Sequence, residues 1–184
     1  MKRIICIISL VLLLSGCKDD ALDNAMLLRE QMQTGEGCSF DAKITADYVD
    51  EIYEFQMNCE SNAVGDVAFS VTAPETISGI TGIVSDEGGK LTFDDQALMF
   101  ELMADGQITP VSAPWILVKT LRGGYLKACT YIDDGMMLVV NDSYEDDALQ
   151  LDIWLNEECI PTEAEILWDG RRILSLQISN FVFL

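Results

Sequence analysis

The 184-residue sequence contains no histidine. Ser-His-Asp and Cys-His nucleophile systems, and the usual zinc sites with histidine, are therefore excluded. Lysine and arginine are scarce, with 11 residues against 31 acidic ones, whereas binding to nucleic acid needs clustered cations. No C-x-x-C pair is present, which disfavours a zinc site made of four cysteines. We therefore expect no nucleic-acid partner.

Acidic residues occur in pairs, but their spacing does not indicate chemistry. We interpret Glu157-Glu158 and Glu163-Ala164-Glu165 as solvated loop and strand edges rather than as hydrolytic carboxylate pairs. Asp133-Asp134 and Asp146-Asp147 lack the spaced oxygen ligands of a dedicated calcium loop. With no catalytic constellation in the sequence, we expect a protein that is not an enzyme and that holds neither a metal nor a cofactor.

The apolar segment from Ile4 to Leu14 is too short to span a membrane as a helix, which needs about 20 residues. With Lys2 and Arg3 in front of it, the segment is typical of a secretory signal. It ends in Leu14-Ser15-Gly16-Cys17, which resembles a bacterial lipobox, the motif cut before a cysteine that carries lipid. The alternative is a plain cleaved signal followed by an incidental cysteine.

We therefore expect residues 1–16 to be a lipoprotein signal peptide and Cys17 to be the lipidated first residue of the mature chain. Several acyl chains on one cysteine anchor a protein stably. The mature protein would then lie on the extracytoplasmic face of the cell membrane, with the membrane as its partner through the N-terminal lipid.

Loss of residues 1–16 removes Lys2 and Arg3 and leaves nine basic residues against 31 acidic ones, a net charge of −22. Such a charge repels anionic headgroups, so the domain needs its lipid to stay on the membrane. One interpretation of the acidity is solubility. The other is a surface that docks a basic envelope protein.

Lipidation of Cys17 leaves an even number of cysteines, which in an exported protein suggests two disulfides. The apolar alternation of residues 38–46 and 53–59 predicts two antiparallel strands around the loop Asp47–Asp50. That register sets Cys38 opposite Cys59, close enough for a disulfide. Cys129 and Cys159 are left as the second pair.

Residues 17–37 are expected to form the lipidated cysteine, a tether and an amphipathic helix. Leu22, Met26 and Arg29 share one face of that helix, and Gly35 and Gly37 end it. A domain over residues 38–184 follows, in which a period of two dominates.

Within this domain we expect about ten strands and one inserted helix. Ser112 caps the helix, Pro114 lies in its first turn and Gly123 closes it. In the last hairpin, Ala164 and Ile166 must share a face with Leu174, Leu176 and Ile178, so we expect an odd loop formed by residues 168–170, with Gly170 in a bulge.

A long antiparallel sheet with one apolar face must curl or be covered by helices. The predicted fold is therefore mainly β (α+β), a curled antiparallel sheet that forms an incomplete half-barrel covered by the N-terminal and the inserted helix. Its concave face would either be an ordinary core or line a cavity for an apolar ligand. The candidate residues for this ligand cavity are Phe40, Ile44, Phe55, Met57, Phe69, Val71, Trp115, Leu149, Leu151 and Ile153.

The stretch Val71–Leu98 contains Ala73-Pro74-Glu75-Thr76, then Ser78-Gly79, then the run Gly89–Asp94. Ser112-Ala113-Pro114 precedes the apolar helix, and an alternating pattern closes the chain from Ile166 to Phe181. In these motifs, roughly residues 20–181 resemble the LolA/LolB-like superfamily of lipoprotein carriers. The resemblance implies an open half-barrel with helices as a lid, which holds a lipid or the acyl chains of a lipoprotein.

Our leading hypothesis is a membrane-anchored lipoprotein whose half-barrel binds a lipid or an acylated lipoprotein. The alternative follows from the resemblance, because many members with this lipobox come from Gram-positive spore formers without an outer membrane. Some of these resemble germination-type lipoproteins that bind and activate a cell-wall amidase. Under that hypothesis the protein docks and regulates a cell-envelope enzyme.

Overall fold

The structure is a computed structural model that describes residues 20–48, 51–94, 96–104 and 107–184. Eleven strands form one antiparallel sheet in the order β6-β5-β4-β3-β2-β1-β13-β12-β11-β10-β9. The first half of the sheet consists of β1 (Cys38–Asp47), β2 (Ile52–Ser61), β3 (Val67–Ala73), β4 (Thr81–Ser85), β5 (Gly88–Phe93) and β6 (Gln96–Phe100). The second half consists of β9 (Tyr125–Ile132), β10 (Gly135–Asn141), β11 (Gln150–Leu155), β12 (Pro161–Trp168) and β13 (Arg171–Phe183).

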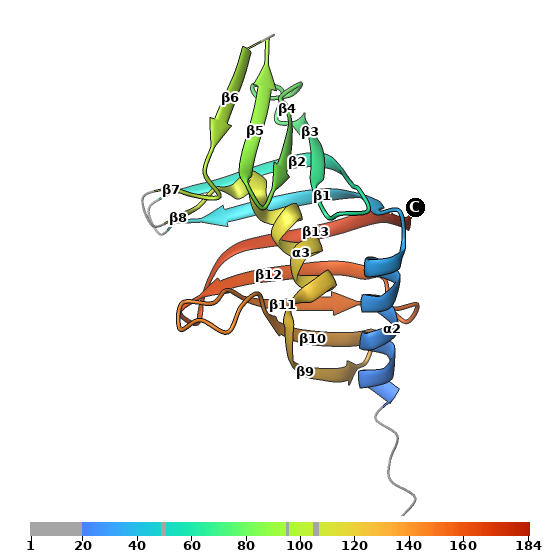
Figure 1. The fold of residues 1–184 in the computed structure, drawn as a ribbon. Coiled ribbons are helices and arrows are strands. Elements are labelled where there is room, and N and C mark those ends of the chain that lie inside the picture. The colour runs from blue at the N-terminus through green and yellow to red at the C-terminus, as the bar shows by residue number, and fades with distance from the viewer. Residues whose placement is uncertain (1–19, 49–50, 95, 105–106) are drawn as a thin grey trace, which may run out of the picture.

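The chain follows a meander that is interrupted once (Figure 1). It runs outward from β1 to β6 and crosses over through the small hairpin of β7 (Met103–Ala104) and β8 (Gln107–Ile108). It then returns from β9 to β13, and β13 pairs with β1 at the centre of the sheet. Since β6 and β9 remain edges, the sheet is not closed, which confirms the predicted incomplete half-barrel.

Two helices lie on the same face of the sheet (Figure 1). The helix α2 (Asp20–Thr34) crosses the strands at one end, next to β9, and α3 (Ala113–Gly123) follows the short helix η1 (Pro110–Ser112). Along α3, every residue from Ala113 to Val118 is buried, and Lys119 is the first exposed one. A helix that is buried almost all round lies inside the curl of the sheet rather than on its surface.

Strands β4, β5 and β6, which we call the wing, extend beyond the helices at one end of the molecule (Figure 1). The turn between β4 and β5 lies over α3, because Lys119 Nζ forms a 3.0 Å ion pair with Asp86. The same ammonium lies 4.7 Å from the ring centre of Trp115. The wing is therefore attached to α3 at one end, and its opposite end is free of the helices.

The N-terminal helix packs with a different face from the one predicted. Its buried residues are Ala21, Ala25, Leu28 and Met32, which recur at helical spacing. Leu22 and Met26 of the predicted face are 42% and 49% exposed. The prediction was wrong because α2 carries apolar residues on more than one side, and the small alanines allow closer approach to the sheet.

The predicted register of the β1–β2 hairpin is also wrong, by two residues. Cys38 lies opposite Ser61, and Cys59 lies opposite Phe40. The connection is longer than expected, since Tyr48 N donates to Glu51 O at 3.0 Å and Asp47 pairs with Ile52. A two-residue shift keeps the same side chains on the same face, so the apolar pattern cannot distinguish the two registers.

In the last hairpin the predicted residues share one face, but the loop differs from the predicted one. Ala164 lies opposite Leu176 and Ile166 opposite Leu174, as expected. The loop, however, has two residues, Asp169 and Gly170, both with positive φ (51° and 72°), rather than three. This is the backbone of a tight hairpin turn. A register shift between Ile166 and Leu167, rather than an odd loop, restores the parity.

Candidate functional site

The concave face of the sheet, for which we expected either an ordinary core or a ligand cavity, is covered by the two helices. Nine of the ten candidate residues are buried, and Leu149 is half-buried. Ile44, Leu151 and Ile153 have an exposed fraction of 0%. A cavity that admits an acyl chain would leave its lining accessible to a water-sized probe, so these side chains are packed core. The nine buried residues are Phe40, Ile44, Phe55, Met57, Phe69, Val71, Trp115, Leu151 and Ile153.

An interior cavity at these residues therefore requires that α3 moves away from the sheet. The contacts of α3 show which of its ends is held more firmly. Arg29 on α2 donates to the carbonyls of Leu121 (3.4 Å) and Gly124 (2.6 Å). Gln33 donates to Arg122 O at 2.5 Å. A cation and an amide on the last carbonyls of a helix satisfy its unpaired acceptors and its dipole.

Arg122 holds the same end of α3 through hydrogen bonds that α3 itself donates to neighbouring elements. Its guanidinium donates to Met32 O on α2 and to Ala63 O at 2.7 Å in the β2–β3 turn. A void of about 10 Å³ between α2, α3 and strands β9 and β10, lined in part by Met26 and Leu126, is no larger than one water molecule. The C-terminal end of α3 is thus fastened to α2 and to the sheet.

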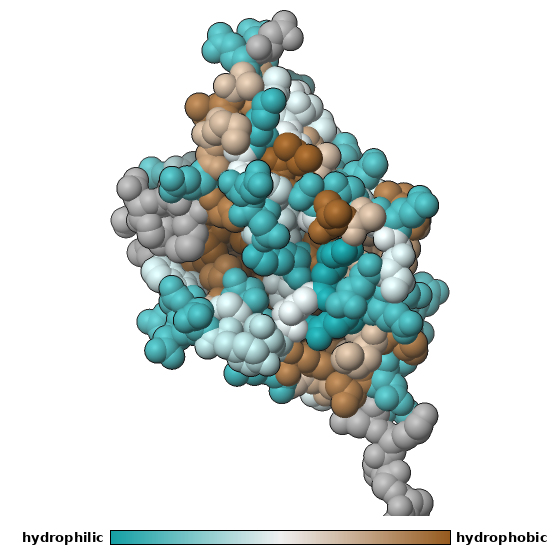
Figure 2. All heavy atoms as spheres, viewed as in Figure 1, coloured by the Kyte–Doolittle hydropathy of each residue, from teal (hydrophilic) through white to brown (hydrophobic). Residues whose placement is uncertain are grey.

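The inner face of the wing is apolar and only partly covered. Leu91 lies opposite Leu98 across β5 and β6. Leu91 is half-buried, while Leu98 is 61% and Phe93 48% exposed. Because side chains alternate along a strand, these three residues share the face that continues into the buried Phe69 of β3. Hydrophobic atoms are visible on the wing in Figure 2.

Two glycines allow the rings on this face to lie flat on the sheet. A Cβ at Gly82 would lie 2.4 Å from the ring of Phe69, and one at Gly89 would lie 2.0 Å from the ring of Phe100. Phenyl rings that cover strand glycines fix the register of neighbouring strands. The apolar face of the sheet therefore extends past the helices onto an ordered surface, which we take as the candidate binding site.

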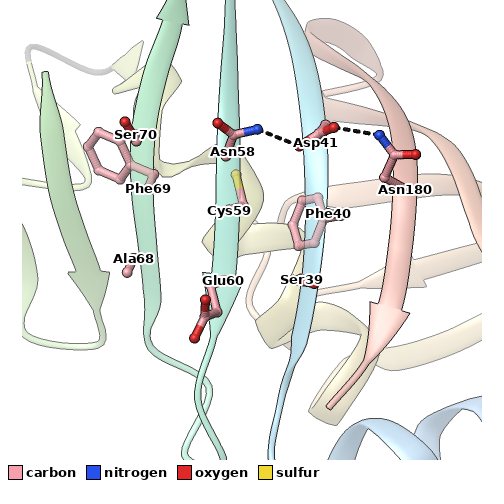
Figure 3. Close-up of a pocket in the computed structure, with 10 residues that line it drawn as sticks. All are labelled: Ser39, Phe40, Asp41, Asn58, Cys59, Glu60, Ala68, Phe69, Ser70 and Asn180. Carbon is pink, nitrogen blue, oxygen red and sulfur yellow. Dashed lines mark hydrogen bonds between the residues drawn. The ribbon is translucent and has the colours of Figure 1, made fainter. Parts of the chain in front are cut away.

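The opposite face of the sheet carries a shallow pocket of about 450 Å³, shown in Figure 3. Asp41 of β1 accepts hydrogen bonds from Asn58 (2.5 Å) and Asn180 (2.7 Å) of the two flanking strands. The two amides lower the pKa of the Asp41 carboxyl. A carboxylate whose two oxygens are both engaged, with a lowered pKa, is poorly suited to act as a general base. We call Asp41, Asn58 and Asn180 the Asp41 row and assign it a structural role.

The cysteines do not show the expected pairing. Cys38 and Cys59 are buried free thiols, and Ser61 rather than Cys59 contacts Cys38, with Sγ 3.3 Å from its hydroxyl. Cys129 lies in β9 and Cys159 in the turn after β11, with β10 between those two strands. The structure contains no disulfide among these four residues. The Cys38–Cys59 prediction depended on the register that the structure corrects.

Cys17, the predicted lipidation site, lies outside the described residues. Within the described part of the chain, no helix is long and apolar enough to cross a membrane. Over the same residues, no group of three or more acidic or cysteine side chains is placed to hold a metal ion.

Sequence reasoning missed the exposed wing residues Phe93 and Leu98. The segment after Asp94 shows little alternation, since Ala97, Leu98 and Met99 are all apolar. The structure explains this pattern, because β6 is an edge strand whose two faces are both exposed. Three consecutive exposed apolar residues on an edge strand are the signal that could have identified the surface.

The fold and surface define an open half-barrel with an apolar wing whose inner face is only partly covered. No family model and no curated protein matches the chain. A putative outer membrane lipoprotein-sorting protein domain from Vibrio parahaemolyticus is similar, with 11% identity over 90% of this chain and 92% of that one, and a TM-score of 0.49. A LolA superfamily protein from Nitrosomonas europaea shows 12% identity over 85% and 92%, with a TM-score of 0.45. The lipoprotein LppX from Mycobacterium tuberculosis shows 12% identity over 89% and 96%, with a TM-score of 0.43.

The superfamily that the sequence motifs resemble is thus among the matches.

Proposed function

We propose that this protein is a membrane-anchored, extracytoplasmic lipoprotein that binds a lipid or the acyl chain of an acylated partner on the inner face of the wing. It acts as a binding protein and not as an enzyme. The observation that carries the proposal is the exposed apolar face of β5 and β6, where Phe93 and Leu98 continue the core beyond the helices. Covering such a surface with an acyl chain removes apolar area from water.

The lipobox supports the membrane anchor, since lipidation of its cysteine would put the acyl chains at Cys17, three residues before α2. The ligand site lies at the wing and not in the interior because α3 fills the concave face. An acyl chain that entered further, between α3 and the sheet, would do so at the N-terminal end of α3, because Arg29 and Arg122 fasten the other end. The resemblance of the sequence motifs to those of the LolA/LolB-like lipoprotein carriers supports the same class of ligand.

Titration of a fluorescent fatty acid into the mature chain carrying Cys17→Ser tests this function. Leu98→Asp places a charge on the inner face and should weaken binding about tenfold or more, because the carboxylate would be buried beneath the ligand. Met99→Asp is the matched control, since Met99 is 70% exposed on the other face of the same strand. Absence of binding to the parent chain, or equal loss in both variants, contradicts the proposal.

The packed interior favours a second function, docking to a protein of the cell envelope. Its basis is the predicted net charge of −22 on the mature chain, together with the exposed apolar residues Ile83 and Met99 on the outer face of the wing. A basic envelope enzyme, such as a cell-wall amidase during spore germination, would suit such a surface. Pull-down from envelope extracts at low salt tests this alternative, and Met99→Lys rather than Leu98→Lys should then abolish capture, because a cation on the outer face repels a basic partner.

A further inference from the structure

Helix α2 exposes three apolar side chains around Asp23 that the domain does not use. Leu22, Met26 and Leu27 are 42%, 49% and 57% exposed, although four other residues of the helix are buried against the sheet. All three lie in the first half of α2, within eight residues of its start at Asp20. At 1.5 Å per residue, this apolar segment lies within about 12 Å of the helix N-terminus. We call these three residues the α2 patch.

The patch continues onto the edge of the sheet. Asn24 Nδ2 donates to Tyr131 Oη of β9 at 2.9 Å, and Tyr131 is itself 53% exposed. Met26 and Leu126 line the same small void between α2 and β9. In Figure 2, hydrophobic atoms gather at this lower end of the molecule, over α2 and β9. The wing lies at the opposite end (Figure 1).

The position of Cys17 limits what can cover the patch. It precedes Asp20 by three residues, which span at most about 11 Å when fully extended. An anchored Cys17 therefore holds the first turn of α2 within that distance of the bilayer. The depth at which amphipathic helices bury an apolar side in the interface is similar, about 5–10 Å.

We infer that the α2 patch and Tyr131 dock on the membrane that holds the acyl chains of Cys17, so that the wing points away from the bilayer. This inference rests on the lipid anchor of the proposed function. Leucine and methionine side chains at the interface bury apolar area, and a tyrosine hydroxyl suits the boundary with water. The domain thus adds a second contact to the lipid anchor and gains a fixed orientation.

The charges around the patch determine which lipids favour the contact. At helical spacing Asp23 lies within the α2 patch and Asp20 and Glu30 border it, while Asp133 and Asp134 form the adjacent turn after β9. These carboxylates repel anionic headgroups, and the repulsion is screened by salt. Docking is therefore apolar and should be stronger on zwitterionic bilayers, or at high salt, than on anionic bilayers at low salt.

Lipidated mature protein in phosphatidylcholine vesicles that contain brominated lipids provides the test. Bromine quenches tryptophan emission only at contact, so a tryptophan introduced in the patch reports its burial in the bilayer. Met26→Trp should add emission that is quenched by about half or more relative to vesicles without bromine. Met99→Trp is the matched control, an exposed methionine on the wing, and its added emission should be unquenched.

Equal absence of quenching in both variants, on protein that floats with the vesicles, overturns the inference while the anchor stands. Failure of the protein to float means that Cys17 carries no lipid and overturns the proposed anchor itself. A second variant set tests the contact without a new fluorophore. Combining Leu22→Ser, Met26→Ser and Leu27→Ser in the non-lipidated chain should lower partitioning to phosphatidylcholine vesicles about tenfold. Unchanged partitioning contradicts the inference.

Discussion

The guanidinium of Arg29 donates a 2.6 Å hydrogen bond to the carbonyl of Gly124, and this bond joins the N-terminal helix to the end of α3. Arg29 also reaches Leu121 O at 3.4 Å, so one side chain serves two carbonyls that the helix itself leaves unpaired. The relationship connects residues 95 positions apart and fixes how the helices cover the sheet.

Removal of this cation should weaken the whole domain. Arg29→Ala leaves partly buried carbonyls without a donor and should lower the free energy of unfolding by about 1.5–3 kcal/mol. Arg29→Lys keeps the positive charge but not the guanidinium that reaches two carbonyls, and it should lower the free energy of unfolding by less. Urea denaturation measures both. Glu30→Ala, at an exposed neighbouring position, should stay within about 0.5 kcal/mol of the parent, and an equal loss there would refute a specific role for Arg29.

A methyl group at Gly82 should disrupt the junction between β3 and the wing. Its Cβ would lie 2.4 Å from the Phe69 ring and 2.6 Å from the carbonyl of Lys90, which cannot move without breaking the strand pairing. Gly82→Ala should therefore cost about 1–3 kcal/mol in thermal or urea unfolding. Gly123→Ala is the control because nothing lies within 4 Å of the place that its new methyl group would take, and it should be neutral or stabilising. Equal stability of both variants would show that Phe69 does not lie over Gly82.

Cys38 and Cys59 should be unreactive thiols in the native protein. Their side chains are 0% and 4% exposed, and burial raises the pKa of both, which disfavours the reactive thiolate. Alkylation of the mature Cys17→Ser chain at pH 8, followed by peptide mapping, should leave both unlabelled until a denaturant is added. Recovery of a Cys38–Cys59 disulfide from natively exported protein would restore the register that the structure rejects.

The Asp41 row should make part of the stability depend on pH. Asn180 and Asn58 hold the pKa of Asp41 below its ordinary value of 3.8, so the unfolded chain binds the proton more readily than the folded one. The contribution is complete above the unfolded pKa and is lost as pH falls through the lower folded value. The stability difference between the parent and Asp41→Asn should thus be larger at pH 6 than near pH 3. An equal difference at both pH values would contradict the role of Asn180 and Asn58.

Much of the architecture can be predicted from the sequence, because alternation of apolar residues fixes which face of each strand is buried. Ala164, Ile166, Leu174 and Leu176 share the core face as their parity requires. Parity leaves shifts of two residues undetermined, which is why the apolar pattern allows Cys38 to pair with Cys59 as well as with Ser61. Longer connections, such as the one closed by Tyr48 and Glu51, determine the register instead.

The candidate site was harder to predict, because burial depends on what packs against a face. The sequence marks Phe69, Leu151 and Trp115 as apolar residues of the concave side, but it does not say that α3 fills that side. It also favours Leu22 and Met26 as the packed side of α2, whereas Ala21 and Ala25 fit closer to the sheet. In both places the deciding factor is the space left between elements that are distant in sequence.

The central claim is that an apolar ligand binds at the wing. Photocrosslinking of a diazirine-bearing fatty acid to the mature chain, with peptide mapping, tests it most directly. Crosslinks should concentrate in residues 88–100, around Phe93 and Leu98, and Leu98→Asp should remove them while Met99→Asp does not. Crosslinks confined to other segments, or none above the level of a denatured control, would contradict it.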